Sequence, residues 1–168
     1  MPFHYTLKEI PSGDEGTFAT VREIIALIKE GKQNPRVRTI ATRVVAGLPW
    51  KNHEVEAGAI FSWIKQNIRF VNDPDGSEML QDVEAILNYK SADCDDLTIL
   101  GASLLGCIGI PSRIVVIAGD PRAPQAFSHI YLQAWCKTKW VGFDTSVVGS
   151  TIGWEPPTFT RKKIIEIA

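Results

Sequence analysis

The spacing of apolar residues changes once along this chain, and the change limits the folds open to it. Up to about residue 108, apolar residues recur at intervals of three and four, which is typical of helices with one buried face. From residue 113 onward they form short runs and alternations that are typical of strands. Helices followed by strands predict an α+β fold.

Turn and capping residues divide this pattern into elements. Residues 1–16 contain a proline and two glycines and are expected to form an extended lead-in. An Asn-Pro pair at Asn34 is a typical helix start, and glycines at Gly31 and Gly109 are plausible helix ends. The expected helices cover residues 17–31, 35 to about 46, 54–68, 81–90 and 97–108, and the expected strands cover 69–71, 113–118, 127–135, 139–144 and 163–167.

Length and charge narrow the class of protein. A chain of 168 residues can form one domain with a proper core and is short for two, so we expect a single domain over residues 1–168, with a core at about 54–146. It shows no repeat, low-complexity tract or linker. The net charge of -1 gives no electrostatic reason to expect nucleic acid or an anionic membrane as partner.

The N-terminus and the cysteines bear on the compartment. Residues 1–12 lack the basic start and apolar stretch of a signal peptide, and apolar runs such as 114–118 are far shorter than a membrane span. The three cysteines, Cys94, Cys107 and Cys136, have no CxxC or zinc-ligand spacing. We therefore expect a cytoplasmic protein with reduced thiols, no disulfide framework, no metal and no cofactor.

Cys94 is the first candidate for chemistry because it lies at the start of an apolar helix. Unpaired N–H groups and the helix dipole favour a thiolate at that position. The carboxylates of Asp93, Asp95 and Asp96 act against this, so we expect them to cap the helix or point away. The alternative is a buried, inert cysteine.

His129 and Asp144 are candidates for a base and its orienting group. On the predicted strand, His129 shares a face with Tyr131 and Gln133, while the apolar residues between them fit the core. Asp144 ends the next strand and could reach the imidazole across the pair. A structural histidine and a turn or capping aspartate are the alternatives. Together, Cys94, His129 and Asp144 are the set that nucleophilic thiol catalysis requires.

Four separated motifs in this order resemble the core of the transglutaminase-like superfamily. The first has the Ala-Asp-Cys-Asp-Asp-Leu helix start and the second contains Gly-Ile-Pro-Ser-Arg; the third is Ser-His-Ile-Tyr, and the fourth runs from Lys-Trp to Asp-Thr. Departures from the family pattern are Ala92 for glycine, Ile130 for tryptophan or valine, and Thr145 for proline, and none removes a catalytic atom. The motifs lie at residues 92–97, 104–115, 128–131 and 139–145.

The resemblance implies a papain-like fold in which the nucleophile helix packs on an antiparallel sheet. It also implies Cys94 as nucleophile, His129 as general base and Asp144 as orienter. An oxyanion hole is required as well. The backbone N–H of Cys94 is the natural first donor, and the side chain of Gln81 matches roughly where the family supplies a second.

The expected reaction is acyl transfer on an amide through a thioester. Water would make the protein a protease or amidase, and an amine would make it a cross-linking enzyme; small microbial members of the superfamily resemble the former, so hydrolysis is favoured. The chain also resembles compact copies in bacterial and phage-derived genomes. The substrate would be a peptide, a protein or another amide, and the loop at 118–125 suggests Arg122 as a contact for a substrate carboxylate.

Two readings from other classes stay open. One is a catalytically silent interaction or assembly module on the same fold. The other is a Ca²⁺-dependent binder that uses acidic loops, although the EF-hand spacing is absent. Those loops contain Asp73, Asp75, Asp93, Asp95 and Asp96. Substrate identity and oligomeric state cannot be read from the sequence.

Overall fold

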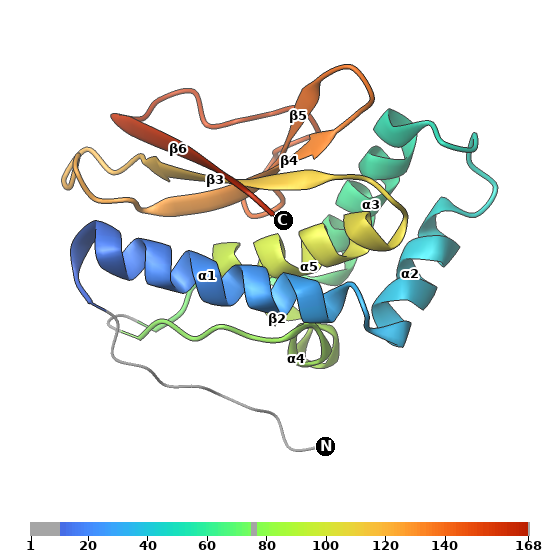
Figure 1. The fold of residues 1–168 in the computed structure, drawn as a ribbon, viewed down its shortest axis with the longest axis horizontal. Coiled ribbons are helices and arrows are strands. Elements are labelled where there is room, and N and C mark those ends of the chain that lie inside the picture. The colour runs from blue at the N-terminus through green and yellow to red at the C-terminus, as the bar shows by residue number, and fades with distance from the viewer. Residues whose placement is uncertain (1–10, 75–76, 168) are drawn as a thin grey trace.

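A computed structural model describes residues 11–74 and 77–167 of the protein. In this part of the chain, five helices lie against a four-stranded antiparallel sheet (Figure 1), which confirms the predicted α+β fold. The helices are α1 (Gly13–Gly31), α2 (Pro35–Val45), α3 (His53–Asn67), α4 (Val83–Tyr89) and α5 (Cys94–Cys107), and the strands are β1 (Arg69–Phe70), β2 (Ser91–Ala92), β3 (Ser112–Ala118), β4 (His129–Trp135), β5 (Trp140–Phe143) and β6 (Arg161–Glu166).

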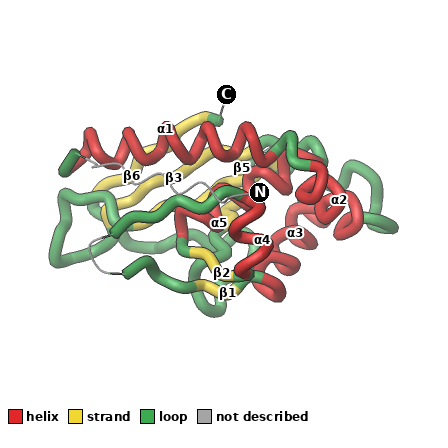
Figure 2. The backbone as a smooth tube through the Cα atoms, turned by 90° about the horizontal axis from the view of Figure 1, so that it is seen from below, coloured by secondary structure: helices red, strands yellow, loops and turns green. Residues whose placement is uncertain are grey.

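The large sheet has the order β5-β4-β3-β6, so β3 and β4 are its interior strands. Their register places Ile114 opposite Leu132 of β4 and Ile165 of β6. The other two strands, β1 and β2, form a short parallel pair beside α4 and α5. Helices cover one face of the large sheet, as the view from below shows (Figure 2).

Helix α5 is the centre of the core. Ten consecutive residues, 96–105, are buried because α1, α2, α3, α4 and the sheet all pack around this helix. Gly101 allows the close approach to the sheet: a Cβ atom there would lie 3.0 Å from Leu132 Cδ1 and 3.2 Å from Phe143 Cε1. The middle of α5 is therefore held tightly against β4 and β5. Among the described helices, none has both the length and the apolar character that crossing a bilayer requires.

Two helices begin earlier than the sequence pattern predicts. Helix α1 begins at Gly13 rather than residue 17, and Gly13 has φ +73°, a conformation that glycine adopts without strain. Helix α5 begins at Cys94 rather than residue 97, because the Asp93 side chain accepts the backbone N–H of Asp96 and caps it. The predicted cap at Asn34 is confirmed. Residues 1–10 of the expected lead-in lie outside the described residues.

The face of the sheet opposite the helices is covered by the connection between β5 and β6. Tyr131 and Gln133 of β4 point to this side and donate hydrogen bonds to Glu155. Gly142 is required here, because a Cβ atom would lie 2.5 Å from the carbonyl oxygen of Trp154. His129 shares this face of β4, as the alternation predicted, while the intervening apolar residues lie in the main core.

Candidate active site

Cys94 is the first residue of α5, and its side chain is half-buried beside the start of β4. The thiol donates a hydrogen bond to Asp95 Oδ1 at 3.7 Å. The backbone N–H of Ile130 also points at the sulfur. The first turn of a helix leaves backbone N–H groups without intrahelical acceptors. The N–H of Asp96 is taken by the Asp93 side chain, so the N–H of Cys94 is the one suited to an oxyanion.

His129 and Asp144 are joined by a short hydrogen bond. His129 Nε2 lies 2.7 Å from Asp144 Oδ2, where the histidine opens β4 and the aspartate directly follows β5. The pairing of Leu132 with Phe143 brings these two positions together on one face of the sheet. The imidazole is 21% exposed and the carboxylate 1% exposed. Since Nε2 is bonded to Asp144, Nδ1 is the ring nitrogen left for proton transfer.

Asp144 is surrounded by donors. The other carboxylate oxygen, Oδ1, accepts from the backbone N–H of Ser146 at 3.1 Å and from its hydroxyl at 2.6 Å. The Ser150 hydroxyl donates to the Asp144 carbonyl, and Lys65 in turn donates to Ser150 Oγ. Burial alone would raise the pKa of Asp144, but the hydrogen bonds and charge from His129 and the bonds from Ser146 outweigh it and hold that pKa below its usual value.

The carboxylates beside Cys94 have the opposite environment. Burial, together with repulsion from neighbouring acids, raises the pKa of Asp93 to about 6, of Asp95 to about 7 and of Asp96 to about 8. Burial first, then the charges of Asp95 and Asp93, raise the pKa of the Cys94 thiol. Asp93 caps the helix as expected. The expectation that the remaining acids point away is wrong for Asp95, whose Oδ1 faces the thiol.

Gln81 supports the first turn of α5 through hydrogen bonds to Asp96. Its side-chain Nε2 donates to the Ser91 carbonyl at 3.1 Å and to Asp96 Oδ2 at 2.7 Å, and its backbone N–H donates to Asp96 Oδ1. The predicted oxyanion role would require the side chain to release one of these acceptors. Two cavities border Cys94, and Gln81 is not among the described residues that line either of them.

Arg122 lies away from these cavities. Its guanidinium is 90% exposed and binds Asp120 through Nε and a terminal nitrogen, at 3.1 and 3.0 Å. The described linings of the two cavities do not include it. The structure therefore brings together Cys94, His129 and Asp144, but neither Gln81 nor Arg122.

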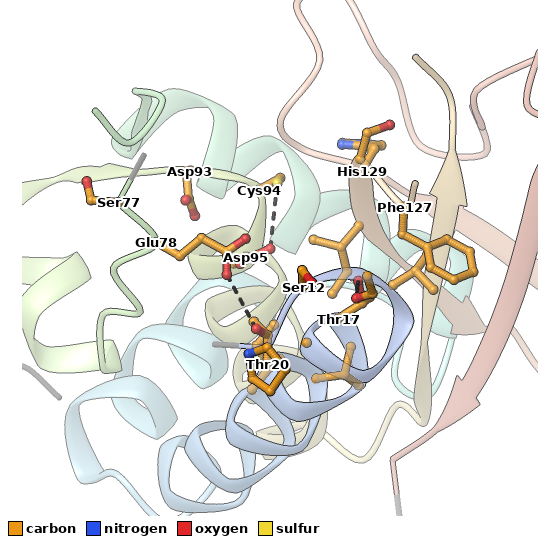
Figure 3. Close-up of a pocket in the computed structure, with 18 residues that line it drawn as sticks. Ser12, Thr17, Thr20, Ser77, Glu78, Asp93, Cys94, Asp95, Phe127 and His129 are labelled. Atoms are coloured by element: carbon orange, nitrogen blue, oxygen red, sulfur yellow. Dashed lines mark hydrogen bonds between the residues drawn. The ribbon is translucent and has the colours of Figure 1, made fainter. Parts of the chain in front are cut away.

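The two cavities that border Cys94 differ in size. The smaller, of about 10 Å³, lies between Cys94, Tyr131 and Asp144. The larger, of about 840 Å³, is called the α1 cavity here because α1 forms one wall (Figure 3). Figure 3 shows Cys94 and Asp95 facing this space from α5, with His129 and Phe127 across from them. Its lining comprises Pro11, Ser12, Gly13, Gly16, Thr17, Thr20, Val21, Ile24, Ser77, Glu78, Asp93, Cys94, Asp95, Val116, Phe127, Ser128, His129 and Ile130.

No pattern in the sequence indicated that α1 would border Cys94. Its apolar spacing predicted an ordinary packing helix, and the polar residues on it carried no motif. Only the packing of α1 along α5 places Thr17 and Thr20 at the cavity. Across the ranges that the structure describes, no group of three or more histidine, cysteine or acidic side chains is arranged to hold a metal ion.

Fold and site together define the class of protein. The model of the transglutaminase-like superfamily core matches residues 38–145, which include most of α2, all of α3 and the sheet through β5. The chain belongs to this superfamily, as its motifs predicted. The match begins before residue 54, the expected start of the core, and excludes α1. No protein with a curated description matches the sequence.

Solved structures share the fold at low sequence identity. A putative cysteine protease from Cytophaga hutchinsonii has a TM-score of 0.51 and 19% identity over 66% of this chain and 37% of its own. A putative protease from Parabacteroides distasonis has a TM-score of 0.56 and 16% identity, over 93% and 36%. LapG from Legionella pneumophila has a TM-score of 0.53 and 18% identity, over 77% and 75%. This chain thus spans little more than a third of the first two proteins.

Proposed function

We propose that the protein carries out cysteine-dependent acyl transfer on an amide, with Cys94 as nucleophile, His129 as general base and Asp144 as orienter. One observation carries the proposal: Cys94 and His129 line the same cavity, while the imidazole is bonded at 2.7 Å to a buried carboxylate. A buried acid with a lowered pKa remains ionised at neutral pH, so it can fix the ring and stabilise its protonated form.

The steps follow from this geometry. His129 takes the thiol proton at Nδ1, and the sulfur attacks the amide carbonyl. The backbone N–H of Cys94, at the start of α5, holds the oxyanion. The intermediate collapses to a thioester, and the leaving amine receives the proton from His129. Water, deprotonated by the same imidazole, then attacks the thioester, releasing the acid and restoring the thiol.

The outcome of the second step separates hydrolysis from cross-linking. The proposed substrate is a peptide, protein or other amide, and we favour hydrolysis because the similar structures from C. hutchinsonii and P. distasonis are named as proteases. A mass shift of water in the products supports hydrolysis, whereas incorporation of added methylamine supports transfer to an amine.

A catalytically silent module is the second candidate, and the environment of Cys94 favours it. A thiol that donates to Asp95 and has a raised pKa is a poor nucleophile unless His129 removes its proton. Such a module would keep the cavity as a binding surface and would leave the sulfur unreactive at neutral pH.

The deciding experiment is the rate of iodoacetamide alkylation at Cys94 across pH, read by peptide mapping. The wild type should label rapidly below pH 7, and His129→Ala should lose this phase, because a thiolate–imidazolium pair needs the imidazole. His53→Ala is the matched control, since His53 begins α3 and lies outside both cavities. Slow labelling with a midpoint at or above about pH 8.5 in all three proteins would refute the enzyme proposal.

A further inference from the structure

The α1 cavity has a long wall that the superfamily core does not supply. Helix α1 lies outside the matched residues, yet its lining positions recur every three or four residues from Gly13 to Ile24. At 1.5 Å per residue, that stretch of helix is about 16 Å long. An extended polypeptide advances about 3.3 Å per residue, so the wall has the length of about five residues.

The lining is apolar at the bottom and polar at the edge. Val21, Ile24, Val116 and Ile130 are almost fully buried and form the apolar part. Hydroxyl groups can donate to backbone carbonyls and accept from backbone N–H groups, which an extended peptide presents along both edges. Five hydroxyl side chains of the lining are partly or fully exposed: Ser12, Thr17, Thr20, Ser77 and Ser128.

Apart from the His129 imidazole, the ionisable oxygen and nitrogen groups of the described lining are all carboxylates. Glu78, Asp93 and Asp95 line the cavity, and no lysine or arginine does so among the described residues. Asp93 and Asp95 are partly buried and close enough to repel one another. Glu78 is exposed, and among the described residues it accepts a long hydrogen bond of 3.4 Å from the Thr20 hydroxyl. A cationic group would relieve this repulsion, and an anionic one would add to it.

We propose that the α1 cavity binds an extended peptide segment carrying a basic side chain, and that Glu78, facing Thr20 at the edge, is a specificity-determining residue for that side chain. The inference rests on the proposed role of Cys94, because it assigns the substrate of that nucleophile. Figure 3 shows the arrangement it requires: Glu78 and Asp95 face Thr20 of α1 on one side, and the sulfur of Cys94 lies at the same opening. The same charges disfavour anionic substrates.

The test uses peptide probes that alkylate the thiol. Acetylated tetrapeptide chloromethyl ketones carry lysine at each position in turn, with alanine elsewhere, and a second series carries glutamate. In each, the thiolate displaces chloride and forms a thioether. At the best position the lysine probe should label Cys94 about tenfold faster than its glutamate partner, because attraction in one and repulsion in the other each contribute modestly. The ratio should fall as salt is added.

Substitutions identify the residues that give the preference for lysine over glutamate probes. Glu78→Gln should bring the lysine-to-glutamate ratio close to one, and Thr20→Arg should invert it. Because the ratio compares two probes on the same variant, any change that a substitution makes in the reactivity of the thiol itself cancels. Glu15→Gln and Ala26→Arg are the matched controls, because both residues are exposed on α1 and lie outside the described cavity lining. Both controls should keep the wild-type ratio.

The failures of the two proposals are distinguishable. Equal labelling by the two series, an unchanged ratio in Glu78→Gln, or labelling by iodoacetamide without labelling by any tetrapeptide would overturn the specificity inference and leave the nucleophile intact. If iodoacetamide itself fails to label Cys94 below pH 7, the proposed function and the inference both fall.

Discussion

The carboxylate of Asp144 and the carboxylates beside Cys94 lie in the same site but in opposite environments. Asp144 is buried among donors from His129 and Ser146, and its pKa lies below the usual value. On the other side of the sulfur, burial first and then the charges of neighbouring acids raise the pKa of Asp95 to about 7, and its Oδ1 accepts a hydrogen bond from the thiol. The residue type is the same, but the partners decide the charge.

This contrast shows how one site can hold acids with opposite tasks. A carboxylate whose oxygens are paired with donors or a cation stays ionised and can orient a base. A carboxylate with acidic neighbours and no cation beside it is destabilised in its charged form, so its pKa rises. Asp144 therefore supports the proposed chemistry in the structure as it stands. The acids on the nucleophile side oppose the thiolate until a positive group, from His129 or from a bound ligand, lies beside them.

Of the substitutions at these carboxylates, Asp144→Asn should change the rate of Cys94 labelling the most. An amide in this position no longer stabilises the imidazolium and can reverse the ring's hydrogen bonding, so labelling of Cys94 by the best chloromethyl ketone should fall by about a hundredfold. Asp120→Asn is the control, because its carboxylate also has a lowered pKa, through Arg122, yet it is outside the described cavity lining. Equal rates in the wild type and Asp144→Asn would exclude Asp144 as the orienter.

An intermediate effect of the opposite sign is expected for Asp95→Asn. Removing this charge lowers the pKa of the Cys94 thiol, so iodoacetamide labelling at pH 7 should rise by about tenfold. If the rate is unchanged or falls, Asp95 does not restrain the sulfur. Asp120→Asn again reports the effect of losing a carboxylate elsewhere.

Asp95→Asn should also change how the free energy of unfolding depends on pH. A raised pKa in the folded state means that the stabilising contribution of Asp95 is complete below the unfolded value near 3.8 and is lost as the pH rises through about 7. Asp144 has a lowered pKa, so its contribution is present above its unfolded value and is lost as the pH falls. In urea unfolding, Asp95→Asn should therefore gain on the wild type between pH 5 and pH 8.5.

The sequence predicted most of the fold, because helix and strand patterns are local, and the order of its motifs predicted that Cys94, His129 and Asp144 would lie together. Strand alternation places His129, and its partner Asp144 lies one hairpin away. Gln81 and Arg122 were harder to place, because their partners, Asp96 and Asp120, are set by competition among neighbouring hydrogen bonds. The role of α1 depends on packing between residues far apart in sequence, which no local pattern records.

The smallest effect should come from Ser146→Ala. The hydroxyl donates one of several hydrogen bonds to Asp144, and the Ser146 backbone N–H still donates to the same oxygen after the substitution. The free energy of unfolding should fall by about 1 kcal/mol and labelling of Cys94 by less than about threefold. Thr42→Ala is the matched control, because its exposed hydroxyl bonds only to carbonyls of its own helix.

The size of this effect decides what keeps Asp144 ionised. If Ser146→Ala costs as much labelling as Asp144→Asn, a single hydroxyl maintains the carboxylate, and the contrast with Asp95 reduces to one hydrogen bond. If it costs little, the charge of His129 and the remaining donors suffice. The low pKa is then a property of the whole pocket, and the two groups of carboxylates differ because only one of them faces a cation.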